Sequence, residues 1–144
     1  MKILEILTEK RKIGNIGEKY AAVFLKKSGH RILKRNYVAL GTEIDIIAYK
    51  KNTFIFVEVK TRTESKITPL EPRPAASVTP EKQQKILKAA AYYRSGIHRE
   101  GRMRFDVIEV FLDGDGKPAR INHLQNTFDK NTAYRFPYGV KDYE

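Results

Sequence analysis

Two apolar segments that lie close together in the chain constrain its fold most strongly. Residues Thr42–Tyr49 and Thr53–Lys60 are rich in Ile, Val and Phe, and only Lys50, Lys51 and Asn52 separate them. Such segments joined by so short a connection predict a β-hairpin. A hairpin that turns on Lys51 and Asn52 pairs residues whose numbers sum to 103. This register predicts that Asp45 lies opposite Glu58.

Acidic side chains interrupt both of these strands. Strand alternation places Glu43 and Asp45 on one face of the first strand with Ile47, and leaves Ile44, Ile46 and Ala48 on the other face. In the second strand Phe56, Glu58 and Lys60 share one face, and Ile55, Val57 and Val59 share the other. Directly opposed residues have Cβ atoms roughly 4.5–5.5 Å apart. Glu43 lies opposite Lys60 in this register, where it either tunes that lysine or forms a simple surface ion pair.

The hairpin acids favour a divalent-metal site. Two close carboxylates repel each other unless a cation lies between them. Hard oxygen ligands suit Mg²⁺, or alternatively Mn²⁺, and such an ion activates water and stabilises charge on a phosphodiester. Lys60, two residues beyond Glu58, would orient or deprotonate the attacking water or neutralise the developing charge. The competing interpretation is a solvated sheet face, but acids within such apolar strands need a partner when buried.

The rest of the chain predicts helices packed against a mixed β-sheet, an α/β protein with one domain over residues 1–144. The expected elements are a helix over Asn15–Ser28 ended by Gly29, a strand over Arg31–Val38, a helix from Thr79 to Arg94, and strands over Met103–Leu112 and Ala119–Leu124. Thr79 has the character of an N-cap, and Pro80 that of a first helical residue. The Pro-containing stretch from Thr61 to Val78 predicts a long loop, mobile over 63–78, and residues 129–144 show no assignable period.

The charge balance points to a polyanionic partner. Lys and Arg total 28 against 17 Asp and Glu, which gives a net charge of +11. Basic groups displace counterions from a phosphate backbone, so nucleic acid is the natural partner, although a soluble Lys-rich surface is the alternative. The absence of Cys and of a long apolar run predicts a cytoplasmic protein without a transmembrane helix.

Several short blocks extend the pattern beyond the hairpin. They are Gly14-Asn15-Ile16-Gly17-Glu18 with Ala21, Arg35-Asn36-Tyr37, Glu43-Ile44-Asp45-Ile46-Ile47-Ala48, Phe56-Val57-Glu58-Val59-Lys60-Thr61-Arg62 and Arg104-Phe105-Asp106-Val107. Asp45 and the later Glu58-Val59-Lys60 also form a D…ExK pattern. Together the blocks resemble the YraN family, a bacterial group of the PD-(D/E)XK nuclease superfamily that is thought to share the fold of archaeal Holliday-junction resolvases. Thr42 departs from the family pattern, which usually has Gly there.

The resemblance implies a restriction-endonuclease-like core and assigns roles to individual residues. Asp45, Glu58 and the backbone carbonyl of Val59 would hold Mg²⁺, and Lys60 would be the catalytic lysine. Glu18 would correspond to the acid that a helix contributes to the site in many members of the superfamily. From periodicity alone, Glu18 is a boundary residue on the inward face of its helix.

Basic and amide side chains near the predicted second helix are candidates for contacts with phosphates. Lys82, Gln84 and Lys85 follow the long loop, and an ordinary solvated helix face is the alternative explanation for them. Arg62 and Arg73 belong to the loop region and would clamp a nucleic-acid backbone.

The leading hypothesis is therefore a Mg²⁺-dependent endonuclease-like protein that hydrolyses branched or structured DNA, plausibly as a homodimer. A second hypothesis is a nucleic-acid-binding or repair-accessory protein that keeps the nuclease fold without turnover. A third is a protein-interaction module whose basic surface serves only solubility. Nucleic-acid binding weakens steeply as salt rises, which separates the third hypothesis from the others.

Overall fold

A computed structural model describes residues 2–63 and 78–129 of the chain. Its elements follow one another as α1 (Ile3–Lys27), β1 (Arg31–Ala39), β2 (Thr42–Lys50), β3 (Thr53–Thr63), α2 (Pro80–Ser95), β4 (Arg102–Leu112) and β5 (Pro118–Phe128). The predicted order of helices and strands is confirmed. No helix in these two ranges combines the length and apolar character needed to cross a membrane.

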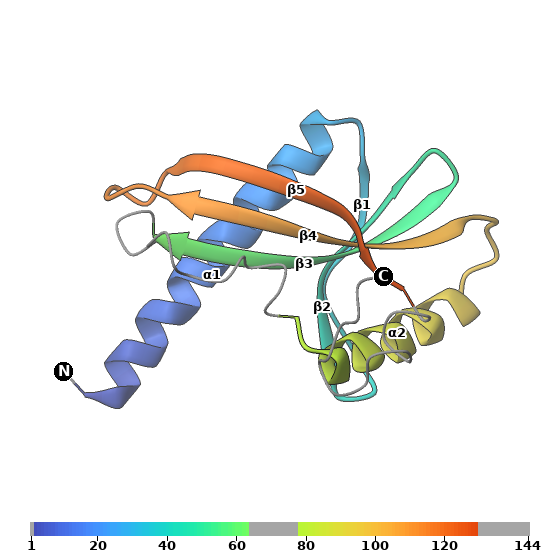
Figure 1. Ribbon diagram of the computed structural model, residues 1–144, viewed down its shortest axis with the longest axis horizontal. Helices are drawn as coiled ribbons and strands as arrows, with labels where there is room; N and C mark the ends of the chain where they lie inside the picture. The colour runs from blue at the N-terminus through green and yellow to red at the C-terminus, as the bar shows by residue number, and fades with distance from the viewer. Residues whose placement is uncertain (1, 64–77, 130–144) are drawn as a thin grey trace, which may run out of the picture.

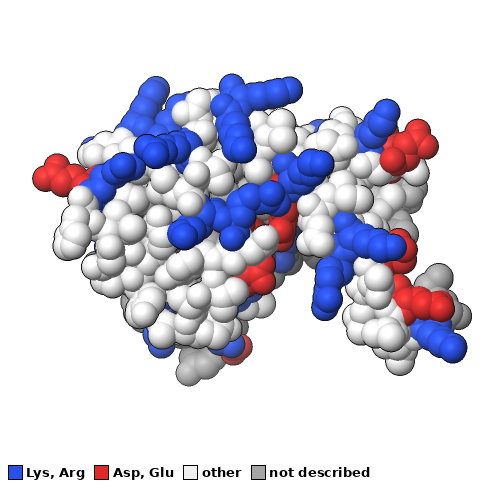
Figure 2. All heavy atoms as spheres, turned by 180° about the vertical axis from the view of Figure 1, so that it is seen from behind, with Lys and Arg blue, Asp and Glu red and all other residues white. Residues whose placement is uncertain are grey.

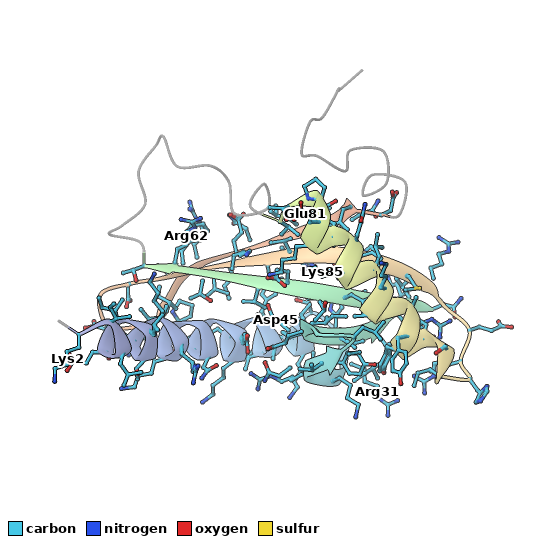
Figure 3. The ribbon with its side chains drawn as sticks, turned by 90° about the horizontal axis from the view of Figure 1, so that it is seen from below. Lys2, Arg31, Asp45, Arg62, Glu81 and Lys85 are labelled. Carbon is cyan, nitrogen blue, oxygen red and sulfur yellow. The ribbon has the colours of Figure 1, made fainter. Side chains whose placement is uncertain are left out.

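The described strands form one mixed sheet with the spatial order β1-β2-β3-β4-β5. Neighbouring strands pair antiparallel, except that β3 and β4 run parallel. Helix α1 covers one face of the sheet and α2 covers the other, as Figures 1 and 3 show. The α/β class is confirmed, and a mixed sheet flanked by helices is consistent with a restriction-endonuclease-like fold.

The central hairpin has the predicted register. Ile46 pairs with Val57 and Lys50 with Thr53, so the paired numbers sum to 103. Lys51 and Asn52 form the turn with φ values of 48° and 57°, the left-handed pair typical of a two-residue hairpin turn. The regular pairing ends at Ile46 and Val57, immediately before the positions of Asp45 and Glu58.

Two apolar clusters hold the helices on the sheet. Ile47 and Phe56 belong to the cluster beneath α2, whereas Ile46 and Val57 belong to the cluster beneath α1. The predicted alternation is wrong at one place, since Ile44 packs with Ile47 beneath α2 rather than with Ile46. The alternation fails because β2 leaves its regular pairing with β3 at Asp45.

Helix α1 begins at Ile3, twelve residues before the predicted start at Asn15. Its first turns carry exposed charged residues and exposed Ile3 and Leu4, so no apolar stripe facing a core marks them in the sequence. Its end matches the prediction. Gly29 has φ +85°, and the amide of His30 donates to the carbonyl of Leu25 over 2.9 Å, which completes a Schellman motif.

The predicted second helix is confirmed, with the Thr79 hydroxyl accepting the Lys82 amide over 3.2 Å. The predicted loop is wrong at its start, because β3 continues through Thr63. At its other end Val78 lies in a bend before α2, and its side chain is buried in the core. Residues 64–77 lie outside the described ranges, as does the C-terminal segment from 130 onward. Strand β5 reaches Phe128, further than predicted, because Phe128 is buried against Phe105.

Helix α1 approaches β3 closely at Gly17. A Cβ atom at this position would overlap the hydroxyl of Thr61 and lie 2.7 Å from its Cβ. Gly17 therefore allows the helix backbone to lie directly on the strand. Glu18 follows Gly17 and Lys60 precedes Thr61, so this contact brings two predicted site residues toward the same end of the sheet.

We expect Gly17→Ala to destabilise the protein by about 1–3 kcal/mol, because the added methyl group overpacks the contact between α1 and Thr61. Gly14→Ala in the same helix is the matched control, since a Cβ there meets nothing within 4 Å. It should stabilise the helix by about 0.5–1 kcal/mol. Urea unfolding measures both effects, and equal stability of the two variants would contradict the close contact.

Candidate functional site

Asp45 lies where the pairing of β2 and β3 ends. Its Oδ2 accepts a hydrogen bond from the backbone amide of Val59 over 2.8 Å. The carboxylate thus occupies the backbone donor that lies just beyond the last regular pair of the two strands, Ile46 with Val57. This bond holds the Asp45 side chain between the two strands.

Two further carboxylates join Asp45. Glu18 from α1 and Glu43 from β2 each place an oxygen so that the three ligand atoms lie within 4.8 Å of one another. Burial, followed by the charge of Glu58, raises the pKa of Asp45 to about 8, against the opposing effect of the Val59 amide. Burial and the Glu43 charge also raise the pKa of Glu18. We call Glu18, Glu43 and Asp45 the acid cluster.

Asn36 is a member of this site that sequence reasoning missed. Its neighbours Arg35 and Tyr37 pair with Ile46 and Ile44, so Asn36 lies opposite Asp45 across β1 and β2. Because carboxylates only accept hydrogen bonds, the amide nitrogen faces them, 2.9 Å from Glu18 Oε2 and 3.1 Å from Glu43 Oε1. Asn36 has φ +52°, a conformation that Asn tolerates better than most residues. The signal in the sequence that could have identified this residue was an Asn within a segment otherwise prone to form a strand.

Glu58 belongs to a separate charge arrangement. Its Oε1 lies 2.6 Å from Lys82 Nζ and 3.5 Å from Lys60 Nζ, and its side chain is only 9% exposed. Lys82 reaches Glu58 from α2, whereas Lys60 lies two residues further along β3. Glu43 belongs to the acid cluster and Lys60 is ion-paired with Glu58, so the structure gives each a nearer partner than the predicted cross-strand pair.

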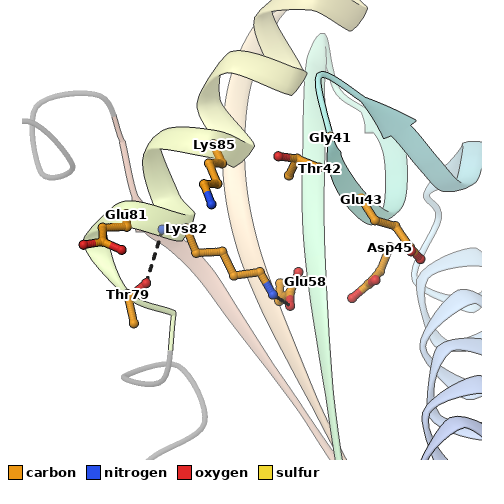
Figure 4. Close-up of a pocket in the computed structure, with 9 residues that line it drawn as sticks. All are labelled: Gly41, Thr42, Glu43, Asp45, Glu58, Thr79, Glu81, Lys82 and Lys85. Carbon is orange, nitrogen blue, oxygen red and sulfur yellow. Dashed lines mark hydrogen bonds and ion pairs between the residues drawn. The ribbon is translucent and has the colours of Figure 1, made fainter.

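Glu43 and Asp45 of the acid cluster, together with Glu58, Lys82 and Lys85, face one cleft of about 430 Å³. It is lined by Gly41, Thr42, Glu43, Asp45, Glu58, Thr79, Glu81, Lys82 and Lys85. Figure 4 shows Lys82 extending from α2 to Glu58, with Glu43 and Asp45 on the opposite side. The cleft therefore presents Glu43, Asp45 and Glu58 on its strand side, and Lys82 and Lys85 together with Glu81 on its helix side.

The other predicted contact residues lie in different places. Lys85 lines the cleft, while Gln84 is half-buried on the same helix. Arg62 lies within β3 rather than in a loop, to one side of Asp45 in Figure 3. Arg73 lies outside the described residues. The backbone of Val59 meets Asp45 through its amide.

The pKa of Asp106 on β4 is shifted in the opposite direction to that of Asp45. Burial opposes its ionisation, but hydrogen bonds from His123 at 2.7 Å, from Arg104 at 2.9 Å and from the Asn126 amide lower the pKa of Asp106 below its usual value. Arg104 of the same strand and two residues of the neighbouring strand therefore satisfy the Asp106 carboxylate. This carboxylate fastens β5 to β4.

We expect Asp45→Asn to stabilise the metal-free protein at neutral pH by on the order of 2 kcal/mol. Between pH 3.8 and about 8 the folded protein retains a proton on Asp45 that the unfolded chain has lost, so stability falls as the pH rises through this window. Asn keeps an oxygen for the Val59 amide and removes the contribution of Asp45 to the pH dependence of stability. Urea unfolding in EDTA across this pH range measures both effects.

Asp106→Asn is the matched control, with the opposite sign. The lowered pKa means that ionised Asp106 stabilises the fold above pH 3.8 and that this contribution is lost as the pH falls through the folded-state pKa. The substitution leaves Arg104 and His123 with a weaker partner and should cost about 3 kcal/mol. Destabilisation by both substitutions at neutral pH would contradict the raised pKa of Asp45.

Comparison with known proteins shows the family of the chain. Residues 17–110 match Uncharacterised protein family UPF0102. A UPF0102 protein of Caldanaerobacter subterraneus subsp. tengcongensis is 41% identical over 121 residues, covering 83% of this chain and 96% of the relative. The UPF0102 protein of Chlorobium phaeobacteroides is 43% identical over 122 residues, covering 81% of this chain and 93% of the relative. That of Desulfosudis oleivorans is 42% identical over 130 residues, covering 89% of this chain and 98% of the relative. The chain therefore belongs to the UPF0102 family, which is the YraN family that its sequence blocks resemble.

Proposed function

We propose that the protein is a divalent-metal-dependent endonuclease that hydrolyses phosphodiester bonds in branched or structured DNA. The observation that carries the proposal is the cleft in which Asp45 of the acid cluster meets Glu58 and two lysines. The three carboxylates of the strand side and the two lysines of the helix side match the two needs of a phosphodiester substrate: a cation site and partners for phosphate oxygens.

The acid cluster fits Mg²⁺ or Mn²⁺ by its chemistry. It offers three hard oxygen ligands within 4.8 Å, and the raised pKa values of Asp45 and Glu18 reflect burial and like-charge repulsion that a cation would relieve. Bound there, such an ion supplies water activation and neutralises charge on the phosphodiester. Asp45 would be the central ligand, with Glu18 and Glu43 beside it. Glu58 and the Val59 carbonyl are the further ligands that the superfamily resemblance implies.

The chain's own residues then divide the remaining tasks. In hydrolysis a water oxygen bonds to phosphorus, one P–O ester bond breaks, and the leaving oxygen takes a proton. Lys60, held 3.5 Å from Glu58, would donate to the phosphoryl oxygen on which negative charge grows. Lys82 and Lys85 would hold neighbouring phosphates from α2.

The wider surface supports a polyanionic substrate. The chain carries a net charge of +11. Figure 2 shows Lys and Arg side chains spread over one face of the molecule, with acidic side chains near its middle and at its edges. Basic surroundings attract DNA over a distance, while the acids at the centre would repel a phosphate until a cation neutralises them.

One observation favours the non-catalytic alternative, a DNA-binding or repair-accessory protein. Lys82 lies 2.6 Å from Glu58 and Lys60 also approaches it, so Glu58 already has cationic partners within the protein. A metal that used both Asp45 and Glu58 would have to compete with Lys82. The two functions differ in turnover, which the following experiment measures.

We expect cleavage of labelled four-way-junction or flap DNA in Mg²⁺ or Mn²⁺, and none in EDTA. Asp45→Asn removes a ligand charge and Lys60→Ala removes the cationic donor, so each should lower the cleavage rate about 100-fold or more. Duplex and single-stranded DNA complete the substrate panel.

Asp115→Asn, on the exposed β4–β5 turn, is the control and should cleave as the unmodified protein does. Salt-sensitive binding without cutting in either metal would overturn the enzyme proposal and support the accessory binder. Binding whose affinity does not change with salt concentration would overturn both the enzyme proposal and the accessory binder.

The cleft lysines generate a separate prediction about binding. Lys85→Ala should weaken DNA binding about equally for all sequences and lower the slope of log affinity against log salt by about 1, because one phosphate contact is lost. Lys12→Ala in α1 is the charge-matched control, since its exposed side chain lies outside the cleft lining. Anisotropy titrations over a salt series measure the slope, and identical slopes for both variants would exclude Lys85 from the interface.

A further inference from the structure

The β1–β2 turn contains a residue in an unfavourable conformation. Ala39 pairs with Thr42, so Leu40 and Gly41 form the whole turn, with φ values of 52° and 73°. Two-residue turns with both φ values positive favour Asn and Gly, and the left-handed region is costly for a bulky side chain. Leu40 is 65% exposed, so burial does not offset this cost.

A second exposed apolar residue lies beside it. Val38 is 66% exposed on the edge strand β1. It pairs with Glu43, and directly paired residues project from the same face of a sheet, so Val38 lies on the side of the acid cluster. We call Val38 and Leu40 the apolar tip.

The apolar tip stands at the rim of the cleft. Gly41 and Thr42, the residues that follow Leu40, line the cleft with Asp45 and Lys85. Figure 4 shows this turn beside the helix that carries Lys85. A ligand that lies across the cleft from Lys85 to Asp45 would therefore meet Leu40 at its edge.

The chemistry of the tip limits what it can contact on DNA. Leu and Val side chains offer no hydrogen bond to a phosphate or sugar, so their favourable partner is the apolar surface of a base. That surface is accessible where stacking is disrupted, and apolar side chains inserted at base steps are an established way to unstack them.

We propose that Leu40 is an apolar wedge that contacts an unstacked base and gives the cleft its preference for DNA with disrupted base stacking. This inference rests on the proposed function only in taking DNA as the ligand of the cleft. It assigns the discrimination between substrates to the β1–β2 turn and leaves phosphate contact to the lysines of α2.

The test compares binding to a duplex with a single unpaired base and to the fully matched duplex. Both carry 2-aminopurine next to the variable position, whose fluorescence rises when it unstacks. Titrations are made in EDTA at low salt, so that neither metal binding nor cleavage enters the result. Leu40→Asn removes the apolar side chain and suits a positive φ, so the turn should persist and the variant should unfold at an equal or higher urea concentration.

The unmodified protein should prefer the duplex with the unpaired base by about tenfold and raise its 2-aminopurine fluorescence. Leu40→Asn should abolish both effects while binding the matched duplex unchanged, and Leu40→Met should restore them. Leu4→Asn is the control for loss of an exposed Leu, at a position that is 75% exposed in the first turn of α1.

A preference that survives in Leu40→Asn, or that Leu4→Asn also loses, would overturn the wedge. Absence of cutting in the metal experiment would leave this binding result intact, so the wedge and the nuclease proposal can fail separately. If the unmodified protein bound neither duplex, DNA would not be the ligand, and the tip would instead be a surface for another class of partner.

Discussion

The direct contact of α1 with β3 at Gly17 is the constraint on which the site depends. No side chain separates the helix from Thr61, so the backbone of α1 lies against the strand. Glu18 can therefore reach Asp45, which the remaining sheet presents from β2. A larger residue would move the helix outward and take Glu18 with it. The acid cluster is thus assembled by packing between elements that are distant in the sequence.

Asp106 and Asp45 show how the same fold stabilises the ionised form of one carboxylate and destabilises that of another. Asp106 receives hydrogen bonds from Arg104, His123 and the Asn126 amide, which outweigh its burial and lower its pKa. Asp45 accepts a hydrogen bond from the Val59 amide, but it is buried and faces other carboxylates, so its pKa rises to about 8. A buried carboxylate with a strongly raised pKa, held at the end of a regular hairpin, has the electrostatic character of a functional site.

Some features followed directly from local sequence. The hairpin register rests on a two-residue turn between apolar segments, and α2 begins where Thr79 and Pro80 predict it. Others could not be predicted in this way. The first turns of α1 carry no stripe that faces the core, and the break in alternation at Ile44 arises from β2 leaving its pairing with β3. Asn36 joins the acids only because β1 lies beside β2.

The sequence by itself therefore determined the α/β class, the family, the hairpin and the chemical type of its acidic and basic residues, because these depend on short-range pattern and residue identity. Only the tertiary structure decided which groups meet. It brings Glu18 and Glu43 close to Asp45 and pairs Glu58 with Lys82 across the cleft. It also places the turn that carries Leu40 at the rim of the cleft. These contacts depend on the distance between neighbouring helices and strands. Packing at positions such as Gly17 sets that distance, and the local sequence pattern does not encode this packing.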